Sequence, residues 1–379
     1  MRRARLGLYI SEYSERNKMD FPLPVYSVTN SQGFCQQYFN KVIASENRSM
    51  YKVVPRGCFA YNPSRINVGS IDWQRNEERV IVSPLYVVFQ TSIEMDNQFL
   101  YYYLRRDVAL TYIKNWGQGS VRDNLKFTQL SQIPINVYPI EEQQLIAQRL
   151  DVLSKLISLR QRQAEKLDEL VKARFVEMFG DPVRNTKHWE KASLLALGSC
   201  KNGMSFHANE SGIKLRCLGV GDFKNLSYID DVEQLPFVSL AEKPSPNCFL
   251  HDGDIVFVRS NGNKALVGRC LLVYPRDTPT IYSGFCIRYR LVTEKVDPIY
   301  ALHVLKADGI RQKMSGRGAN IQNLNQKILA AIEMPIPPLP LQNAFATFVY
   351  EVDREKERIQ RSAALLETLK RSLMQQYFG

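Results

Sequence analysis

One stretch of this 379-residue chain occurs twice. Shifting the sequence by 199 positions places residues 117–180 on residues 316–379 without a gap. An ungapped repeat of this length indicates that the chain folds as two copies of one structural unit. The identical positions, given by their first-copy numbers, include Gly117, Gly119, Asn124, Leu125, Ile133, Pro139, Gln143, Ala147, Gln161, Arg162, Ala164, Leu167, Leu170, Phe179 and Gly180.

Weaker echoes of the repeat lie upstream of each copy. Two apolar runs typical of strands, GCFAY (57–61) and GDIVF (253–257), are each followed by polar residues typical of turns. The run SPLYVVF (83–89) resembles SGFCIRY (283–289), and the amphipathic run FLYYYL (99–104) resembles IYALHV (299–304). We therefore expect two globules of mixed α/β fold, each followed by one long segment.

Each long segment carries the heptad pattern of a coiled-coil helix. Mostly apolar residues recur at alternating spacings of four and three, with charged residues between them. Pro139 and Pro340 stand near the two helix starts, where proline is tolerated, and Gly180 ends the first helix. The seam positions are Ile146, Leu150, Leu153, Ile157, Arg160, Ala164, Leu167, Val171, Arg174 and Met178, and then Phe345, Val349, Val352, Lys356, Ile359, Ala363, Leu366, Lys370, Leu373 and Tyr377.

A helix of this length needs a partner for its narrow apolar stripe. At 1.5 Å per residue it extends about 57 Å, longer than an ordinary surface helix. The first helix carries the chain from the first globule to the second, and the second helix starts at the second globule. This order predicts an antiparallel coiled coil that holds the globules apart, with pseudo-two-fold symmetry.

The positive net charge of the chain indicates which class of molecule it binds. It has 50 Lys and Arg against 38 Asp and Glu, a formal net charge of +12. An excess of this size indicates an anionic partner, usually nucleic acid. The seven scattered cysteines indicate reduced thiols and no zinc site. Because the sequence shows neither a signal peptide nor a transmembrane run, we expect a cytoplasmic protein with no membrane partner.

Polar loops follow the strand-like runs in both copies, and their residue types are those that contact DNA. Arg suits guanine edges, Asn and Gln suit adenine, Lys and Ser suit phosphate, and glycine allows close backbone approach. Asn124 and Asn323 could instead be helix N-caps before Leu125 and Leu324. The predicted DNA-binding residues are Asn62, Ser64, Arg65, Asn67, Ser120, Arg122 and Asn124 in the first copy, and Arg259, Ser260, Asn261, Asn263, Lys264, Arg317, Asn320, Gln322 and Asn323 in the second.

The sequence contains no recognisable catalytic or metal-binding set. Asn62-Pro63-Ser64 lacks the second proline and the aromatic residue of a DNA methyltransferase motif. No third glycine follows either Gly-x-Gly phrase at dinucleotide spacing, and there is no ATP-binding loop motif. The four histidines are isolated from one another. We therefore expect a recognition protein and no catalytic residues.

The sequence resembles the specificity (S) subunits of type I restriction–modification systems over essentially its whole length. The resemblance rests on the repeat and on PIEEQQLIAQRLDVLSKLISLRQRQAEKLDELVKARFVEMFGD (139–181), with its proline, early glutamine, long heptad helix and closing Met-Phe-Gly. The phrase GDIVFVRSNGN (253–263) is similar to a strand and loop of a target recognition domain. In the second copy, Lys356 and Lys370 depart from the apolar seam.

The resemblance implies a division of the chain into four parts. Residues 1–138 would form target recognition domain 1 and residues 181–337 target recognition domain 2. Residues 139–180 and 338–379 would form the conserved spacer helices. Such a noncatalytic subunit would bind an asymmetric bipartite target in double-stranded DNA with a nonspecific gap.

The resemblance also implies partners. The chain would recruit two adenine-N6 methyltransferase subunits and a restriction/translocase subunit, and S-adenosylmethionine, ATP and Mg would bind those partners instead of this chain. Two alternatives are a stand-alone DNA-binding or bridging protein that has lost its enzyme partners, and an enzyme with an unrecognised site. Methyltransferase contacts would lie on the outward helix faces and nearby domain surfaces. The candidates, for each of which a solvated coiled-coil face is the alternative, are Gln143, Arg149, Arg162, Lys166, Gln342, Arg354 and Arg361.

Overall fold

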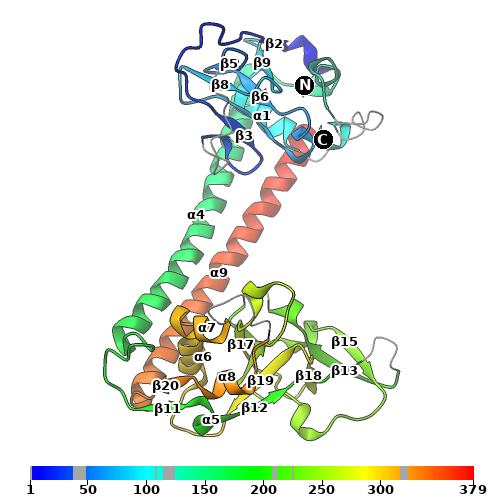
Figure 1. Cartoon of the computed structure of the whole chain (residues 1–379). Helices are drawn as coiled ribbons and strands as arrows, with labels where there is room; N and C mark the ends of the chain where they lie inside the picture. The colour runs from blue at the N-terminus through cyan, green and yellow to red at the C-terminus, as the bar shows by residue number, and fades with distance from the viewer. Residues whose placement is uncertain are drawn as a thin grey trace. The chain divides into compact units, whose positions relative to one another are not determined.

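The chain forms two compact units that share the two longest helices (Figure 1). The computed structural model describes residues 2–36, 48–106, 109–113, 124–206, 211–223, 226–315 and 323–379. The first unit comprises Met1–Arg162 with Gln360–Gly379, and the second comprises Gln163–Ile359. Helix α4 (Ile140–Phe179) and helix α9 (Leu339–Phe378) each contribute one part to each unit. Within the described residues, we find no helix long and apolar enough to cross a membrane.

The first unit is built on a four-stranded antiparallel sheet of order β2-β9-β6-β7. Three two-stranded pairs, β1-β10, β3-β4 and β5-β8, accompany it, together with the short helices α1 and α3. The strands are β1 (Arg2–Arg5), β2 (Ile10–Glu12), β3 (Ser27–Thr29), β4 (Gly33–Cys35), β5 (Lys52–Pro55), β6 (Phe59–Tyr61), β7 (Ile71–Trp73), β8 (Arg79–Val82), β9 (Val87–Thr91) and β10 (Pro134–Val137), and the helices are α1 (Asn97–Leu104) and α3 (Phe127–Leu130).

The second unit has a five-stranded sheet of order β12-β19-β16-β17-β14, a three-stranded sheet β15-β13-β18 and the pair β11-β20. Its strands are β11 (Lys191–Ser193), β12 (Gly198–Asn202), β13 (Ile213–Leu218), β14 (Tyr228–Ile229), β15 (Phe237–Leu240), β16 (Asp254–Val258), β17 (Cys270–Val273), β18 (Thr280–Tyr282), β19 (Cys286–Leu291) and β20 (Glu333–Pro335). Its short helices are α5 (Leu194–Leu197), α6 (Pro298–Lys306), α7 (Asp308–Ser315) and α8 (Gln326–Ala330).

The repeat extends through both globules. The order β2-β9-β6-β7 in the first unit corresponds to β12-β19-β16-β17 in the second, and β1-β10 corresponds to β11-β20. Asp96 accepts a hydrogen bond from Phe99 N at the start of α1, as Asp297 does from Tyr300 N at the start of α6. The weak upstream echoes therefore predicted equivalent strands and helices correctly, and both units have a mixed α/β fold.

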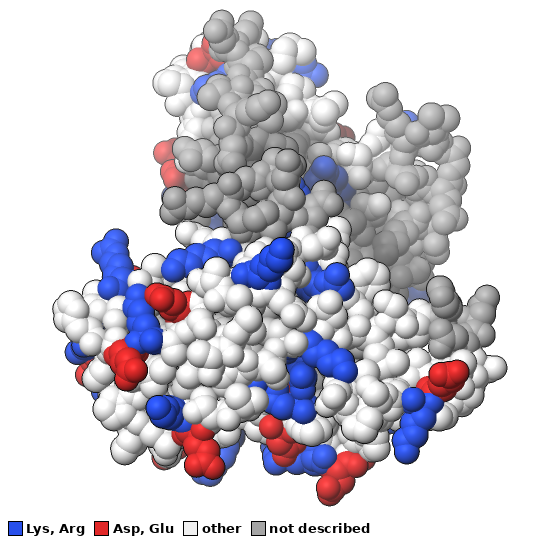
Figure 2. All heavy atoms as spheres, turned by 60° about the horizontal axis from the view of Figure 1, so that its bottom comes forward, with Lys and Arg blue, Asp and Glu red and all other residues white. Residues whose placement is uncertain are grey.

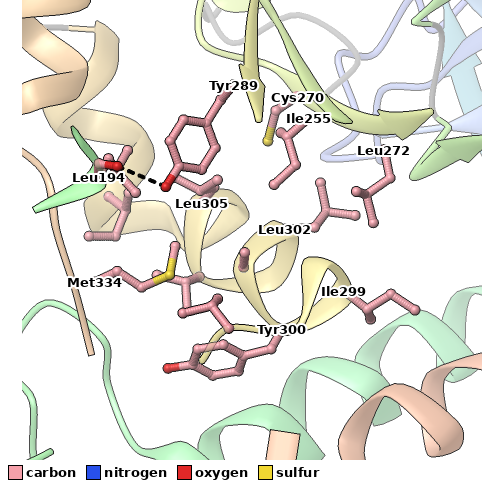
Figure 3. Close-up of a cluster of buried hydrophobic side chains, with 14 of the residues drawn as sticks. Leu194, Ile255, Cys270, Leu272, Tyr289, Ile299, Tyr300, Leu302, Leu305 and Met334 are labelled. Carbon is pink, nitrogen blue, oxygen red and sulfur yellow. Dashed lines mark hydrogen bonds between the residues drawn. The ribbon is translucent and has the colours of Figure 1, made fainter. Parts of the chain in front are cut away.

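Each central sheet carries apolar side chains on both faces. In β6, Phe59 and Tyr61 pack on the side of α1, whereas Ala60 packs on the side of β5 and β8. This alternation is the two-residue period of a strand. In the second unit, side chains of α6 pack against those of β16, β17 and β19 (Figure 3), and the Tyr289 hydroxyl donates a hydrogen bond to Leu194 O at 2.9 Å.

A buried glutamine fixes the first turn of each long helix. Gln143 Oε1 accepts from Asp96 N, and its Nε2 donates to Glu94 O and Tyr138 O. Gln342 makes the three equivalent bonds in the second unit, accepting from Asp297 N and donating to Lys295 O and Pro337 O. Both side chains are completely buried. The prediction that Gln143 and Gln342 face outward toward a partner is therefore wrong.

A phenylalanine anchors the last turn of each long helix. Phe378 of α9 is buried in the first unit, 5.1 Å in ring-centroid distance from Phe99. Phe179 of α4 is buried in the second unit, 4.7 Å from Tyr300. Gly180 follows with φ +76°, the left-handed conformation that commonly ends a helix. The repeated closing Phe-Gly is therefore an anchor followed by a helix stop.

Within each unit, the parts of α4 and α9 run antiparallel. In the first unit, Arg149 Nη1 donates to Tyr377 Oη at 2.8 Å, so an early residue of α4 meets a late residue of α9. In the second unit, Phe345 near the start of α9 packs 5.4 Å from Phe179 at the end of α4. These contacts agree with the predicted direction of pairing.

The polar seam positions behave in three ways. Lys356 forms an ion pair with Asp168 of α4. Lys370 Nζ lies 5.4 Å from the ring centroid of Tyr102, and burial lowers its pKa. Arg174 is exposed and pairs with Glu177 on its own helix, so its assignment to the seam is wrong. There the buried residues follow four-residue steps, Val171, Phe175 and Phe179, because the helix enters the core of the second unit.

His303 of α6 is half-buried and packs against aromatic rings. Its ring lies 5.1 Å from that of Phe345 and 6.2 Å from that of Phe175. Burial, with a smaller contribution from Lys306, lowers the pKa of His303 from 6.5 to about 3. The imidazole is therefore neutral at physiological pH and serves as a packing residue.

We expect Phe378→Ala to destabilise the first unit by about 3–5 kcal/mol, because it removes a buried aromatic anchor. Hydrogen exchange should accelerate at the amides of α1, which contacts Phe378, while the amides of α6 keep their protection. The exposed Gln376→Ala should leave both unchanged. Equal loss of protection in both units would contradict the assignment of Phe378 to the first core.

We expect His303 to make folding stability sensitive to mild acid. Because its folded pKa is depressed, the unfolded state binds a proton below pH 6.5 that the folded state excludes, so stability falls as pH falls. Between pH 7 and pH 5 this loss is about 2 kcal/mol. Chemical denaturation at both pH values should show that His303→Phe lacks this component. An identical pH dependence in the two proteins would refute it.

Candidate nucleic-acid interface

In the second unit, three chain segments meet where β16 ends. The first is the loop that begins with Arg259, and the second is the turn at Gly284 and Phe285 before β19. Arg259 N donates to Phe285 O at 2.8 Å, and Arg259 Nη1 donates to Gly284 O at 3.2 Å. The third segment returns at Leu324, whose N donates to Arg259 O at 2.8 Å. Ser260 and Asn323 form an antiparallel bridge beside this bond.

The first unit brings together the equivalent segments. The loop after β6 starts at Asn62, and Leu125 N donates to Pro63 O at 3.2 Å. The buried Tyr61 hydroxyl donates to Leu125 O at 3.1 Å, which is a second hydrogen bond to the Leu125 segment. Leu125 and Leu324 are both buried, so the repeated Asn-Leu phrase places a leucine in each core and an exposed asparagine beside each loop.

Several of the predicted DNA-binding residues form hydrogen bonds within their own loops. Asn62 Oδ1 accepts from Ser64 N and Ser64 Oγ, and Asn261 Oδ1 accepts from Asn263 N. Asn263 Oδ1 accepts from Ala265 N and caps a short 3-10 helix. These bonds use the amide oxygens and shape the turns. Asn67 is half-buried in the 3-10 turn Ile66–Val68.

The side chains of Ser64, Arg65, Asn124, Lys264 and Asn323 are exposed, and that of Arg259 is half-buried. The sequence prediction therefore identified loops that come together in both units, although it did not separate loop-shaping amides from outward side chains. Ser120, Arg122, Arg317, Asn320 and Gln322 lie outside the described residues.

The alternative that Asn124 and Asn323 cap helices is wrong. Helix α3 begins at Phe127 with Lys126 at its N-cap, and α8 begins at Gln326 with Asn325 at its N-cap. Asn325 Oδ1 accepts from Ile328 N in the usual capping geometry. Leu125 and Leu324 each lie two residues before their helix, and the backbone N of each donates a hydrogen bond to the neighbouring loop.

One face of the second unit carries a surplus of basic side chains (Figure 2). On the face that Figure 2 turns forward, Lys and Arg side chains are more widespread than Asp and Glu. The chain as a whole carries a formal net charge of +12. Such a surface attracts a polyanion through long-range electrostatics.

The described residues offer little acid–base or nucleophilic chemistry. Burial raises the pKa of Cys58, Cys200 and Cys270 to about 11, and that of Cys217 and Cys286 to about 12, so these thiols stay protonated. Among the described residues, no group of three or more His, Cys, Asp or Glu side chains is placed to hold a metal.

Sequence comparison gives the family. The family model described as "Type I restriction modification DNA specificity domain" matches residues 11–169 and 188–367, well over half of the chain. The MjaVIII specificity subunit of Methanocaldococcus jannaschii is 24% identical over 311 residues, which span 75% of this chain and 71% of that subunit. The EcoKI specificity subunit of Escherichia coli is 22% identical over 301 residues, spanning 74% of this chain but only 64% of that subunit.

Solved structures share the fold. The S subunit of a type I restriction-modification system from M. genitalium matches 100% of this chain and 96% of its own, with a TM-score of 0.56 and 15% identity. A chain from a structure described as "Structural basis underlying complex assembly and conformational transition of the type I R-M system" matches 100% and 97%, with a TM-score of 0.60 and 18% identity. With its duplicated fold and its two matched segments, the chain belongs to the type I restriction–modification DNA specificity family.

Proposed function

We propose that this chain is the noncatalytic DNA-specificity subunit of a type I restriction–modification complex. The observation that carries the proposal is that each unit joins the loop after its central strand to the repeated Asn-Leu segment by a backbone hydrogen bond, Leu125 N to Pro63 O and Leu324 N to Arg259 O, with different loop side chains. Asn62, Ser64 and Arg65 occupy the first loop, whereas Arg259, Ser260 and Asn261 occupy the second. Two unlike sites on one chain suit an asymmetric target with two unlike half-sites.

The proposed division follows the fold. Residues 1–138 and 181–337 act as target recognition domains, and residues 139–180 and 338–379 act as spacer helices. Each long helix has 40 residues and therefore extends about 60 Å at 1.5 Å per residue. We infer that the helices form one antiparallel coiled coil with pseudo-two-fold symmetry. The antiparallel contacts within each unit support this arrangement.

The helices also offer a surface for the enzyme partners. In the first unit, α4 exposes a row of apolar side chains with heptad-like spacing, and none of these residues is a seam position. On α9, Leu365 and Leu369 are exposed one turn apart. Exposed apolar rows on helices favour docking of partner helices, and we assign the methyltransferase contact to them. The row on α4 consists of Leu145, Val152, Leu156 and Leu159.

Domain exchange tests the two-site assignment. Replacing residues 1–138 by the corresponding part of another specificity subunit should change one half of the recognised DNA sequence and preserve the other, because each loop site is complete within its own unit. Sequencing of N6-methyladenine in a host that carries the whole system would measure this. A change in both halves would disprove modular recognition.

Shortening the spacer tests the role of the helices. Deleting residues 159–165 and 360–366 removes one heptad from each helix and keeps the seam in phase. The helices shorten by about 10 Å, so the nonspecific gap should lose about three base pairs. Both half-sites should stay the same in the methylation pattern. Deleting only residues 159–165 is the matched control, because it disrupts the pairing register. A gap that keeps its length in the double deletion would exclude the spacer role.

A further inference from the structure

One large apolar side chain is exposed at the same place in both units. Leu85 precedes β9 and is 76% exposed, and Phe285 precedes β19 and is 63% exposed. Each sits on a turn closed by the same hydrogen bond, Tyr86 N to Ser83 O at 3.0 Å and Cys286 N to Ser283 O at 2.8 Å. Two units that differ in loop sequence thus keep an apolar residue at this turn.

Both turns adjoin the candidate DNA-binding loops. Phe285 O accepts from Arg259 N at 2.8 Å and from Ser260 N at 3.2 Å, so the turn and the loop are tied backbone to backbone. In the first unit, Tyr61, the last residue of β6, pairs with Val87, the first residue of β9. Asn62 directly follows Tyr61 in the chain, and Leu85 comes two residues before Val87. The turn at Phe285 is therefore bonded to the loop at Arg259, and Leu85 lies two residues before the strand pair from which the loop at Asn62 continues.

We propose that Leu85 and Phe285 are base-contacting residues, one for each half-site, a step that rests on the proposed function. DNA is the occupant that fits because the flanking loops carry arginine, lysine and amide side chains, and the chain is strongly basic. An apolar side chain beside such groups contacts the methyl group of thymine in the major groove, or wedges between base steps in the minor groove. Leucine and phenylalanine differ in shape, so they contribute different preferences to the two halves.

The experiment uses the full chain assembled with its methyltransferase subunits. N6-methyladenine sequencing with the wild-type complex first defines the target, and duplexes carrying that target then serve as probes in competition binding. The variants are Leu85→Ala and Phe285→Ala. The matched controls are Ile93→Ala and Val292→Ala, since these residues are 95% and 70% exposed and lie just beyond the opposite ends of the same strands.

We expect Leu85→Ala to weaken discrimination about tenfold at one half-site only, and Phe285→Ala to do so at the other half-site. Phe285→Leu, which keeps an apolar contact, should retain more discrimination than Phe285→Ala. Replacing thymine by deoxyuridine in the affected half-site should reproduce the loss if the contact is a thymine methyl, and should have no effect if the side chain is a wedge. The two controls should bind like the wild type.

Different failures have different meanings. A wild-type complex without any sequence preference would overturn both the proposed function and this inference. A bipartite target read equally well by Leu85→Ala and Phe285→Ala would overturn the inference alone. Loss of methyltransferase from the purified complex, with discrimination intact, would show that the turns bind protein and would also overturn it. Unchanged thermal unfolding midpoints would establish that the variants fold.

Discussion

The buried carboxamide at the start of each long helix is the interaction on which the rest of the fold depends. Gln143 joins three backbone groups from two segments, the loop before α1 and the residue that follows β10. A buried backbone group left without a partner costs about 1–3 kcal/mol, so no apolar side chain can replace the glutamine without loss. The same bonds at Gln342 set the direction in which α9 leaves its sheet.

The helix ends add a second constraint. Helix α4 starts against the core of the first unit through Ile146 and Leu150, and its last turn enters the core of the second unit through Phe179. Helix α9 does the reverse, with Phe345 in the second core and Phe378 in the first. Because each core includes residues from both helices, neither globule can complete its core from its own strands and short helices alone.

The sequence predicted the duplicated plan well, because it depends on local and periodic signals. Heptad spacing identified both long helices, and Gly180 identified the stop. The roles of Gln143 and Gln342 were missed because a polar residue in a charged helix usually faces water, and only the bonds to Asp96 and Asp297 show otherwise. One signal could have indicated a buried role: Gln143 and Gln342 are identical in the two copies, whereas most residues around them differ.

The candidate site was predictable only in part. The polar loops after β6 and β16 were found because turn residues follow apolar strands in both copies. The contact between the loop at Arg259 and the turn at Phe285 was missed, because it joins residues far apart in the chain and because an apolar residue directly before a strand is easily taken as part of that strand. Likewise, the distinction between a loop-shaping amide such as Asn62 and an outward side chain such as Arg65 requires the hydrogen bonds themselves.

The two copies are alike at several buried positions and differ in the candidate DNA-binding loops. Several of the residues they share point inward: the two glutamines, the closing phenylalanines and the leucines at 125 and 324 are all buried. The loops that these residues hold in place differ in charge and shape, with Arg65 on a tight Asx-type turn in one unit and Arg259 bonded to the neighbouring turn in the other. Because the buried set fixes where the loops lie, the exposed set can change without disturbing the cores. A duplicated scaffold of this kind can therefore acquire two unlike binding surfaces while keeping one fold.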